Sequence, residues 1–69
     1  MVEVDARGLS CPEPLMMVDK AMKAHPGEPL KVYVTEAHSR TNVEKFARSK
    51  GRTVTTKAVG QEYEVLIEL

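Results

Sequence analysis

The chain has 69 residues, one cysteine, and ten basic against ten acidic side chains, so its formal net charge is zero. A chain of this length has room for one core and buries only about 60% of its unfolded surface, which argues against a deep substrate cavity and favours chemistry at the surface. The charge balance argues against nonspecific nucleic-acid binding through bulk charge, and the single cysteine excludes an internal disulfide.

These features are typical of a small cytoplasmic protein, and we expect residues 1–69 to form a single domain without linkers or repeats. No apolar run has the length of a signal peptide or a membrane span, so no membrane binding is expected. His25 and His38 are too few histidines for a credible metal centre. We expect neither a metal nor another cofactor, and no direct nucleic-acid binding.

The first predicted element is a short strand. Val2-Glu3-Val4-Asp5 alternates apolar and polar residues, which predicts that Val2 and Val4 face the core. Asp5 ends this strand, and its carboxylate either orients the following loop through hydrogen bonds to the backbone or faces solvent. Gly8 is expected to provide a tight or left-handed turn in that loop.

A helix is predicted from Leu15 to Ala24, and its i, i+3, i+7 spacing predicts an apolar stripe against a sheet. The stripe consists of Leu15, Val18, Ala21 and Met22. Met16 and Met17 cannot both join it, so one of them is a candidate for contact with a partner, and core packing is the alternative. The segment His25-Pro26-Gly27 ends the helix.

The single cysteine lies just before this helix, in the segment Asp5-Ala6-Arg7-Gly8-Leu9-Ser10-Cys11-Pro12-Glu13-Pro14. A residue before proline is pushed out of the helical region, which suits Cys11 to the N-cap position. Ser10 competes for that position, because Ser10 and Glu13 have the spacing of a capping box. In either case Cys11 lies at or beside a helix N-terminus, where negative charge is stabilised. We therefore expect a moderately activated thiol, assisted by Arg7 and opposed by Glu13.

The next predicted elements are a strand from Leu30 to Thr35 and a second helix that ends near Lys50. A strand, a helix and a strand in this order predict parallel pairing of the two strands. A polar loop, Glu36 to Arg40, leads into the second helix. The candidate caps are Ser39 and Thr41, and Thr41 has the spacing of a capping box with Glu44. The core-facing residues predicted for these two elements are Leu30, Val32, Val34, Val43, Phe46 and Ala47.

Two further strands, Arg52 to Val59 and Glu62 to Leu69, are predicted to form a hairpin around Gly60-Gln61. The inward positions of the last strand are Tyr63, Val65, Ile67 and Leu69. The order β-α-β-α-β-β predicts a two-layer α/β (α+β) sandwich, with a four-stranded mixed sheet and both helices on one face. The other face is expected to meet water through Glu3, Lys31, Tyr33, Thr55 and Lys57.

Two polar segments are expected to meet at one edge of this sheet, because ligands of open α/β sheets gather where parallel strands end. Cys11 follows the first strand, and the loop Glu36–Arg40 follows the second. His38 and Arg40 are therefore candidates for tuning the thiolate or for docking a partner. The alternative is that both are solvated loop side chains, because a cysteine–histidine pair needs contact distance.

The pattern Asp5-x-x-Gly8-Leu9-x-Cys11-Pro12-x-Pro14 resembles the signature of the TusA/SirA-like sulfur-carrier family, and the family's small domain spans the whole chain. The resemblance implies the sandwich fold, and a sulfurtransferase-type carrier that works with partner proteins. Cys11 would accept a sulfane sulfur as a persulfide from a donor such as a cysteine desulfurase. It would then pass that sulfur to an acceptor protein, in a pathway such as tRNA thiolation, molybdenum-cofactor maturation, sulfur oxidation or selenium metabolism.

The site expected around Cys11 combines the residues of this motif with neighbours that the charge and helix patterns and the predicted sheet edge suggest. The residues that would shape the site are Asp5, Gly8, Leu9, Pro12, Glu13 and Pro14, and the candidates for thiolate tuning or partner docking are Arg7, Met16, Met17, Glu36, His38 and Arg40. Relatives usually carry an aspartate near Glu36, where this chain has Thr35-Glu36-Ala37-His38. The alternative function is a binding or regulatory module without thiol chemistry, in which Cys11 is structural.

Overall fold

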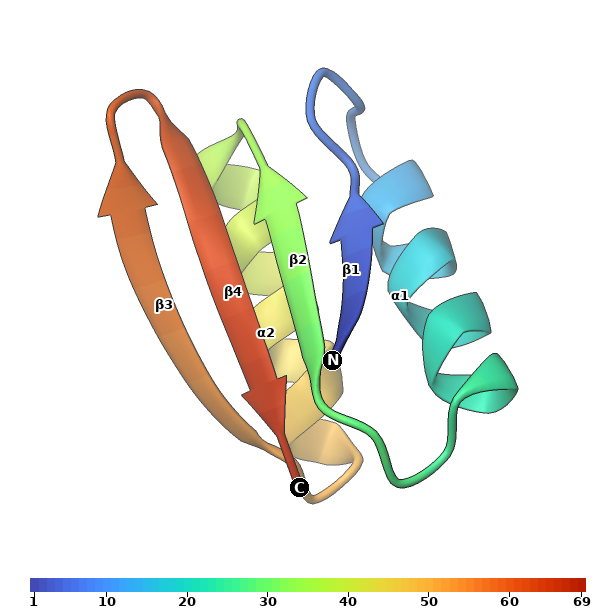
Figure 1. Ribbon diagram of the computed structural model, residues 1–69. Coiled ribbons are helices and arrows are strands. Elements are labelled where there is room, and N and C mark those ends of the chain that lie inside the picture. The colour runs from blue at the N-terminus through green and yellow to red at the C-terminus, as the bar shows by residue number, and fades with distance from the viewer.

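The computed structural model describes residues 1–69 and has two layers, a four-stranded sheet and a pair of helices behind it (Figure 1). The elements in chain order are β1 (Val2–Asp5), α1 (Glu13–Ala24), β2 (Leu30–Val34), α2 (Ala37–Ser49), β3 (Thr53–Val59) and β4 (Glu62–Glu68). Both helices pack on one face of the sheet and against each other. The predicted β-α-β-α-β-β sandwich is confirmed.

The strand order in the sheet is β1-β2-β4-β3. β1 and β2 run parallel, as the crossover predicts, with Val4 opposite Val32. β4 lies between β2 and β3 and is antiparallel to both. As a result, the carboxyl ends of β1 and β2 and the β3–β4 turn all lie at one edge of the sheet, at the top of Figure 1.

The hydrophobic core fills the space between the sheet and the helices. Its buried members are Val4, Ala6, Val18, Leu30, Val32, Val34, Val43, Ala47, Val65 and Ile67. Leu30, Val32 and Val34 alternate along β2 with half-buried residues, because successive side chains of a strand point to opposite faces. The inward positions predicted for β2 are therefore confirmed.

The core-facing side of α1 differs from the prediction in one position. Pro14 and Val18 are buried, and Met17 packs against the core. Leu15 is only half-buried and lies outside the core, so the prediction that it belongs to the stripe is wrong. The i, i+3, i+4 stripe starts one residue earlier, at Pro14, and that rotation turns Leu15 aside and leaves Met16 exposed.

No side chain caps either helix, so the predicted caps are wrong. The N-cap of α1 is Pro12, and the turn that precedes the helix is closed by a backbone hydrogen bond of 3.0 Å from the Glu13 N–H to the Ser10 carbonyl oxygen. Cys11 therefore precedes the cap, and Ser10 contributes its backbone oxygen instead of its hydroxyl. The Cys11–Pro12 peptide bond is cis.

The second helix begins at Ala37, so most of the predicted loop from Glu36 to Arg40 is helical. Neither predicted cap acts as one: Ser39 is buried with an unpartnered hydroxyl, and the Thr41 hydroxyl donates to the Ala37 carbonyl oxygen at 3.0 Å. The carboxylate of Glu44 accepts a hydrogen bond from Thr56 of β3 and does not complete a capping box. Packing against the sheet extends α2 through residues whose polarity alone suggests a loop.

The last strand ends at Glu68, and Leu69 beyond it is 66% exposed. The prediction that Leu69 faces the core is therefore wrong, because the core under β4 ends with Ile67.

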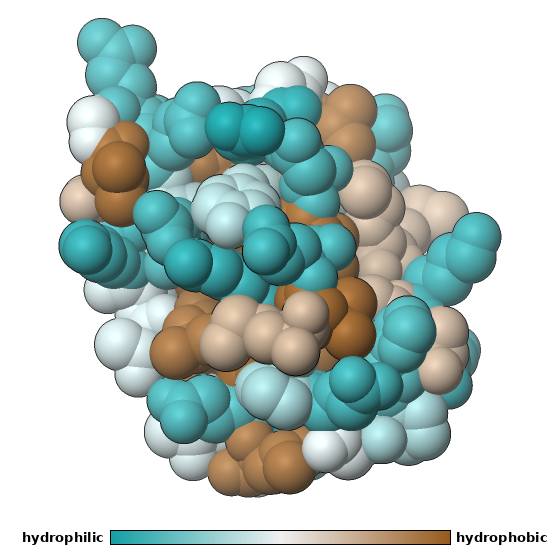
Figure 2. All heavy atoms as spheres, in the orientation of Figure 1, coloured by the Kyte–Doolittle hydropathy of each residue, from teal (hydrophilic) through white to brown (hydrophobic).

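The uncovered face of the sheet is mostly hydrophilic, with smaller hydrophobic patches (Figure 2). There the Tyr33 hydroxyl donates to Glu3 at 3.0 Å, and this hydrogen bond raises the pKa of Tyr33.

Candidate functional site

The loop between β1 and α1 is fixed at its start by Asp5. The Asp5 Oδ1 accepts hydrogen bonds from the Arg7 backbone N–H at 3.1 Å and from the Arg7 Nε at 2.9 Å. The Asp5 Oδ2 pairs with the Arg7 Nη2 at 2.8 Å. These hydrogen bonds from Arg7 lower the pKa of Asp5 to about 2. Asp5 thus orients the loop through the backbone, one of its two predicted roles.

Further contacts join this loop to the neighbouring strand. The Ala6 N–H donates to the Tyr33 carbonyl oxygen at 2.8 Å, which extends the pairing of β1 and β2 by one residue. Gly8 has a φ of 77°, the left-handed value predicted for it. Its N–H donates to the Thr35 hydroxyl at 3.0 Å, and Leu9 packs against the core. The backbone before Cys11 is therefore held by hydrogen bonds to β2 and to Thr35, which follows it, and by the packing of Leu9 against the core.

The Cys11 thiol is free and exposed. Its Sγ accepts a hydrogen bond from the Asn42 Nδ2 at 3.0 Å. Since Asn42 lies on α2, the site is formed by two segments that are 31 residues apart in the chain. An exposed sulfur at the edge of the sheet is accessible to a second protein.

The other residues predicted for the site differ in how accessible they are to a partner. Met16 is 64% exposed and Glu13 is exposed, so both are available to a partner, whereas Pro14 and Met17 pack inward. Arg7 is engaged elsewhere in the loop. Its guanidinium lies 5.5 Å from the centre of the Tyr33 ring, and its Nη1 lies 3.4 Å from Glu62 at the start of β4.

The candidate residues predicted for the loop after β2 lie at the start of α2 in the structure. Glu36 is the exposed N-cap, and His38 is exposed and lines a shallow hollow with Ala37 and Thr41. His38 also precedes Asn42 by four residues, which places both on the same side of α2. His38 therefore lies on the side of α2 that carries the Cys11 contact, although it makes no hydrogen bond to the sulfur.

Arg40 contacts residues other than Cys11. Its guanidinium lies 5.0 Å from the centre of the Tyr63 ring, and its Nη1 is 3.9 Å from Glu44. The Nε of Arg40 is buried without a partner. Arg40 thus joins α2 to β4, and its assignment as a group that tunes Cys11 has no contact to support it.

Asn42 is the site residue that sequence reasoning missed. An asparagine in the middle of a helical pattern carries no motif of its own. Its spacing of one helical turn from His38 becomes a signal only once α2 is known to begin at Ala37, before His38. The contact with Cys11 itself depends on how α1 and α2 pack.

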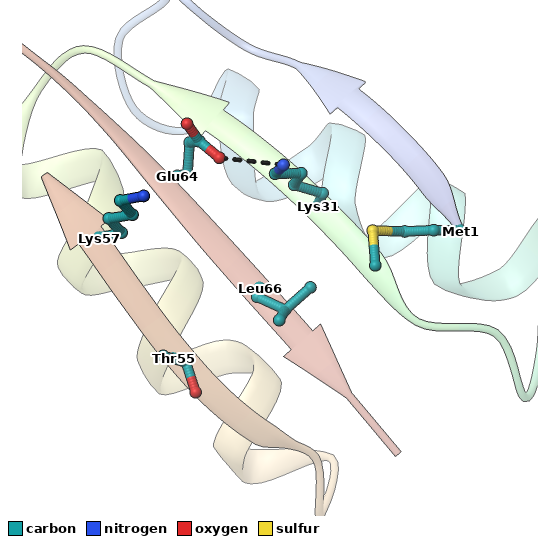
Figure 3. A pocket seen from close by; sticks show the side chains of 6 residues that line it. All are labelled: Met1, Lys31, Thr55, Lys57, Glu64 and Leu66. Atoms are coloured by element: carbon teal, nitrogen blue, oxygen red, sulfur yellow. Dashed lines mark ion pairs between the residues drawn. The ribbon is translucent and has the colours of Figure 1, made fainter. Parts of the chain in front are cut away.

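A separate hollow lies on the uncovered face of the sheet (Figure 3). Its lining consists of Met1, Lys31, Thr55, Lys57, Glu64 and Leu66. The Lys31 Nζ pairs with Glu64 at 3.1 Å, and this contact raises the pKa of Lys31.

No group of three or more histidine, cysteine, aspartate or glutamate side chains is arranged to hold a metal ion. Neither helix has the length and hydropathy of a membrane-spanning segment.

The Asp5–Arg7 pair gives a pH-dependent prediction. Replacement of Arg7 by alanine is expected to raise the pKa of Asp5 from about 2 towards 3.8, because the side-chain hydrogen bonds that favour the carboxylate are lost. Since the pKa of the folded state lies below that of the unfolded state, the pair stabilises the fold above about pH 4, and this contribution is lost as the pH falls towards 2. NMR titration of the Asp5 carboxyl carbon measures the change.

Arg48→Ala provides the matched control, because Arg48 is an exposed arginine near the end of α2. This variant should leave the Asp5 titration where it is in the wild type. An Asp5 midpoint that is the same in Arg7→Ala and in the wild type would contradict the role given to Arg7.

Comparison with known proteins agrees with this arrangement. A family model described as "Sulfurtransferase TusA" matches residues 2–69. A SirA-like protein from Desulfitobacterium hafniense has a crystal structure that superimposes with a TM-score of 0.90 at 30% identity, covering 97% of this chain and 95% of that one.

Two relatives carry the names of sulfur carriers. The putative sulfur carrier protein YrkF of Bacillus subtilis is 36% identical over 62 residues, which are 87% of this chain and 34% of that protein. The sulfur carrier protein TusA of Pseudomonas paraeruginosa is 46% identical over 44 residues, 62% of this chain and 56% of that protein. The chain thus aligns with about a third to just over half of these relatives' length. The match to the family model over residues 2–69, together with the fold and the placement of Cys11, shows that the chain belongs to the TusA family.

Proposed function

We propose that the chain is a sulfur carrier that accepts a sulfane sulfur on Cys11 as a persulfide and transfers it to a partner protein. The observation that carries the proposal is the exposed Cys11 thiol, held in a fixed loop and hydrogen-bonded by Asn42. The names of the relatives, which are sulfur carrier proteins, support the same activity.

The chemistry requires no oxidant and no cofactor. The Cys11 thiolate attacks the outer sulfur of a donor persulfide, R–S–SH. A bond forms between the Cys11 Sγ and that sulfur, the donor S–S bond breaks, and R–S⁻ leaves with the electron pair. In the second step an acceptor thiolate attacks the outer sulfur of the Cys11 persulfide, and Cys11 is released as a thiolate.

The shape of the molecule favours transfer between proteins over turnover of a small molecule. Cys11 is exposed on the loop between β1 and α1, and it lines none of the hollows of the molecule. Donor and acceptor proteins would therefore supply the rest of each reaction site. Exposed Met16 in the first turn of α1, and exposed His38 in the first turn of α2, offer further contacts to a partner. A single domain working in the reducing cytoplasm keeps such a thiol available.

Mass spectrometry of the intact protein tests this function. The wild-type protein is incubated with a cysteine desulfurase and cysteine, and a gain of one sulfur mass is expected, which dithiothreitol reverses. Protein alkylated beforehand at Cys11 provides the control and should gain no mass. If several donor proteins add no sulfur to a thiol that still reacts with iodoacetamide, the binding module without thiol chemistry becomes the better interpretation.

A further inference from the structure

The hydrogen bond from Asn42 is the only one that the structure gives to the Cys11 sulfur, with 3.0 Å between Nδ2 and Sγ. An amide N–H is a donor, and a thiolate is an acceptor for which hydrogen bonding stabilises the charge. The contact therefore places a donor where negative charge would develop on the Cys11 sulfur. None of the other polar side chains assigned to the site, Arg7, Glu36, His38 and Arg40, makes a hydrogen bond to this sulfur.

Asn42 is held in place by its position on α2. The next residue, Val43, is fully buried, and Ser39 one turn earlier is buried as well. Because these neighbours fix the rotation of α2 against the core, the half-buried Asn42 side chain is directed to the side where α1 begins. A donor that is fixed before reaction loses little conformational freedom when charge develops on the sulfur.

We propose that Asn42 is a catalytic residue of sulfur exchange at Cys11. The inference deepens the proposed function and rests on it. During discharge, an acceptor thiolate bonds to the outer sulfur, the bond between that sulfur and the Cys11 Sγ breaks, and the Sγ departs with the electron pair. The Asn42 N–H stabilises the negative charge that the Sγ gains in this step.

The two half-reactions depend on Asn42 to different degrees. In discharge the Cys11 Sγ is the leaving group, and a thiolate that is better stabilised leaves faster. In uptake the Cys11 Sγ is the attacking group and loses negative charge, so the hydrogen bond assists this step less. Removal of the N–H donor should therefore slow discharge by about threefold to tenfold and slow uptake by less.

Two variants distinguish the effect of the Asn42 N–H donor from the effect of the shape of its side chain. Asn42→Ala removes the amide at a helical position where alanine is favourable, so folding should be preserved. Asn42→Asp keeps the shape but replaces the N–H donor by a carboxylate beside the sulfur, and should slow discharge more than Asn42→Ala. Arg48→Gln is the control for charge, because it also changes the net charge by one negative unit, at an exposed position about 9 Å further along α2.

The first measurement is the rate of Cys11 alkylation by iodoacetamide as a function of pH, and it requires no persulfide. Near pH 7 the reaction of Asn42→Ala should be about twofold to threefold slower than that of the wild type. At high pH, where the thiols of both proteins are fully ionised, the difference should vanish or reverse. A residue that only supported the fold would not produce this dependence on pH.

The second measurement is discharge in a single turnover. Cys11 is loaded with inorganic polysulfide, its thiolate taking one sulfane sulfur and releasing a shorter polysulfide, and the loss of that sulfur to dithiothreitol is followed by mass. Slower discharge in both Asn42 variants, with Arg48→Gln unchanged, supports the proposal. Alkylation and discharge rates that match the wild type in both Asn42 variants would overturn it.

These results are independent of the test of the proposed function. If no desulfurase loads the wild-type protein while the alkylation rates still differ as expected, the carrier function fails and the effect of Asn42 on the thiolate stands. If loading succeeds and the variants show no difference, the carrier function stands and the role of Asn42 is rejected.

Discussion

Replacement of Cys11 by serine is expected to abolish sulfur uptake, so that the variant gains no sulfur mass after incubation with a desulfurase and cysteine. Serine has nearly the same shape, but its hydroxyl is not ionised near neutral pH and does not form a persulfide. The chain has no second cysteine to take over the reaction. The measurement is the intact mass of wild-type and variant proteins treated in parallel.

Two controls show whether sulfur uptake is lost because the thiol is absent or because the variant is unfolded. Because Cys11 is exposed and lies outside the core, Cys11→Ser should change the free energy of unfolding by less than about 0.5 kcal/mol. Ser10→Ala alters the neighbouring exposed side chain and should retain sulfur uptake. A Cys11→Ser protein that still gained one sulfur mass would place the acceptor at another residue and refute the mechanism.

The largest loss of stability is expected from Leu30→Ala. Leu30 is fully buried at the start of β2, and truncation of such a side chain costs about 2–5 kcal/mol through lost burial and the cavity that remains. A domain of 69 residues has a free energy of unfolding of roughly 3–10 kcal/mol. Leu30→Ala should therefore remove much of the stability, which urea unfolding followed by circular dichroism measures.

Leu69→Ala is the control, because it removes the same side chain at an exposed position. Leu69 is 66% exposed, so its truncation should cost less than about 0.5 kcal/mol. Similar midpoints of unfolding for the two variants would contradict the core described above. The comparison also tests whether β4 ends before Leu69.

The site depends on two connections between the β1–α1 loop and the segment that follows β2. Gly8 donates to the Thr35 hydroxyl, and Cys11 accepts from Asn42. Both connections exist because parallel pairing of β1 and β2 places the two segments at the same edge of the sheet. A substitution in either segment is therefore expected to affect the environment of the sulfur.

Sequence reasoning failed where a helix boundary depended on packing. The polarity of the segment from Glu36 to Arg40 predicts a loop, yet α2 starts at Ala37. Local propensity is a weak guide at such boundaries, because burial of Val43 and Ala47 against the sheet stabilises the turns that precede them. The same limit explains why neither Ser10 nor Cys11 caps α1.

The sequence by itself determined the order of strands and helices, the buried face of β2, the left-handed turn at Gly8 and the place of Cys11 ahead of a helix. Periodicity, glycine and proline encode these features locally, within a few residues. Only the tertiary structure decided that β4 lies between β2 and β3, that Arg40 faces Tyr63, and that Asn42 contacts Cys11. These contacts join residues far apart in the chain, and their geometry follows from how the two helices pack on one twisted sheet, which no local pattern specifies.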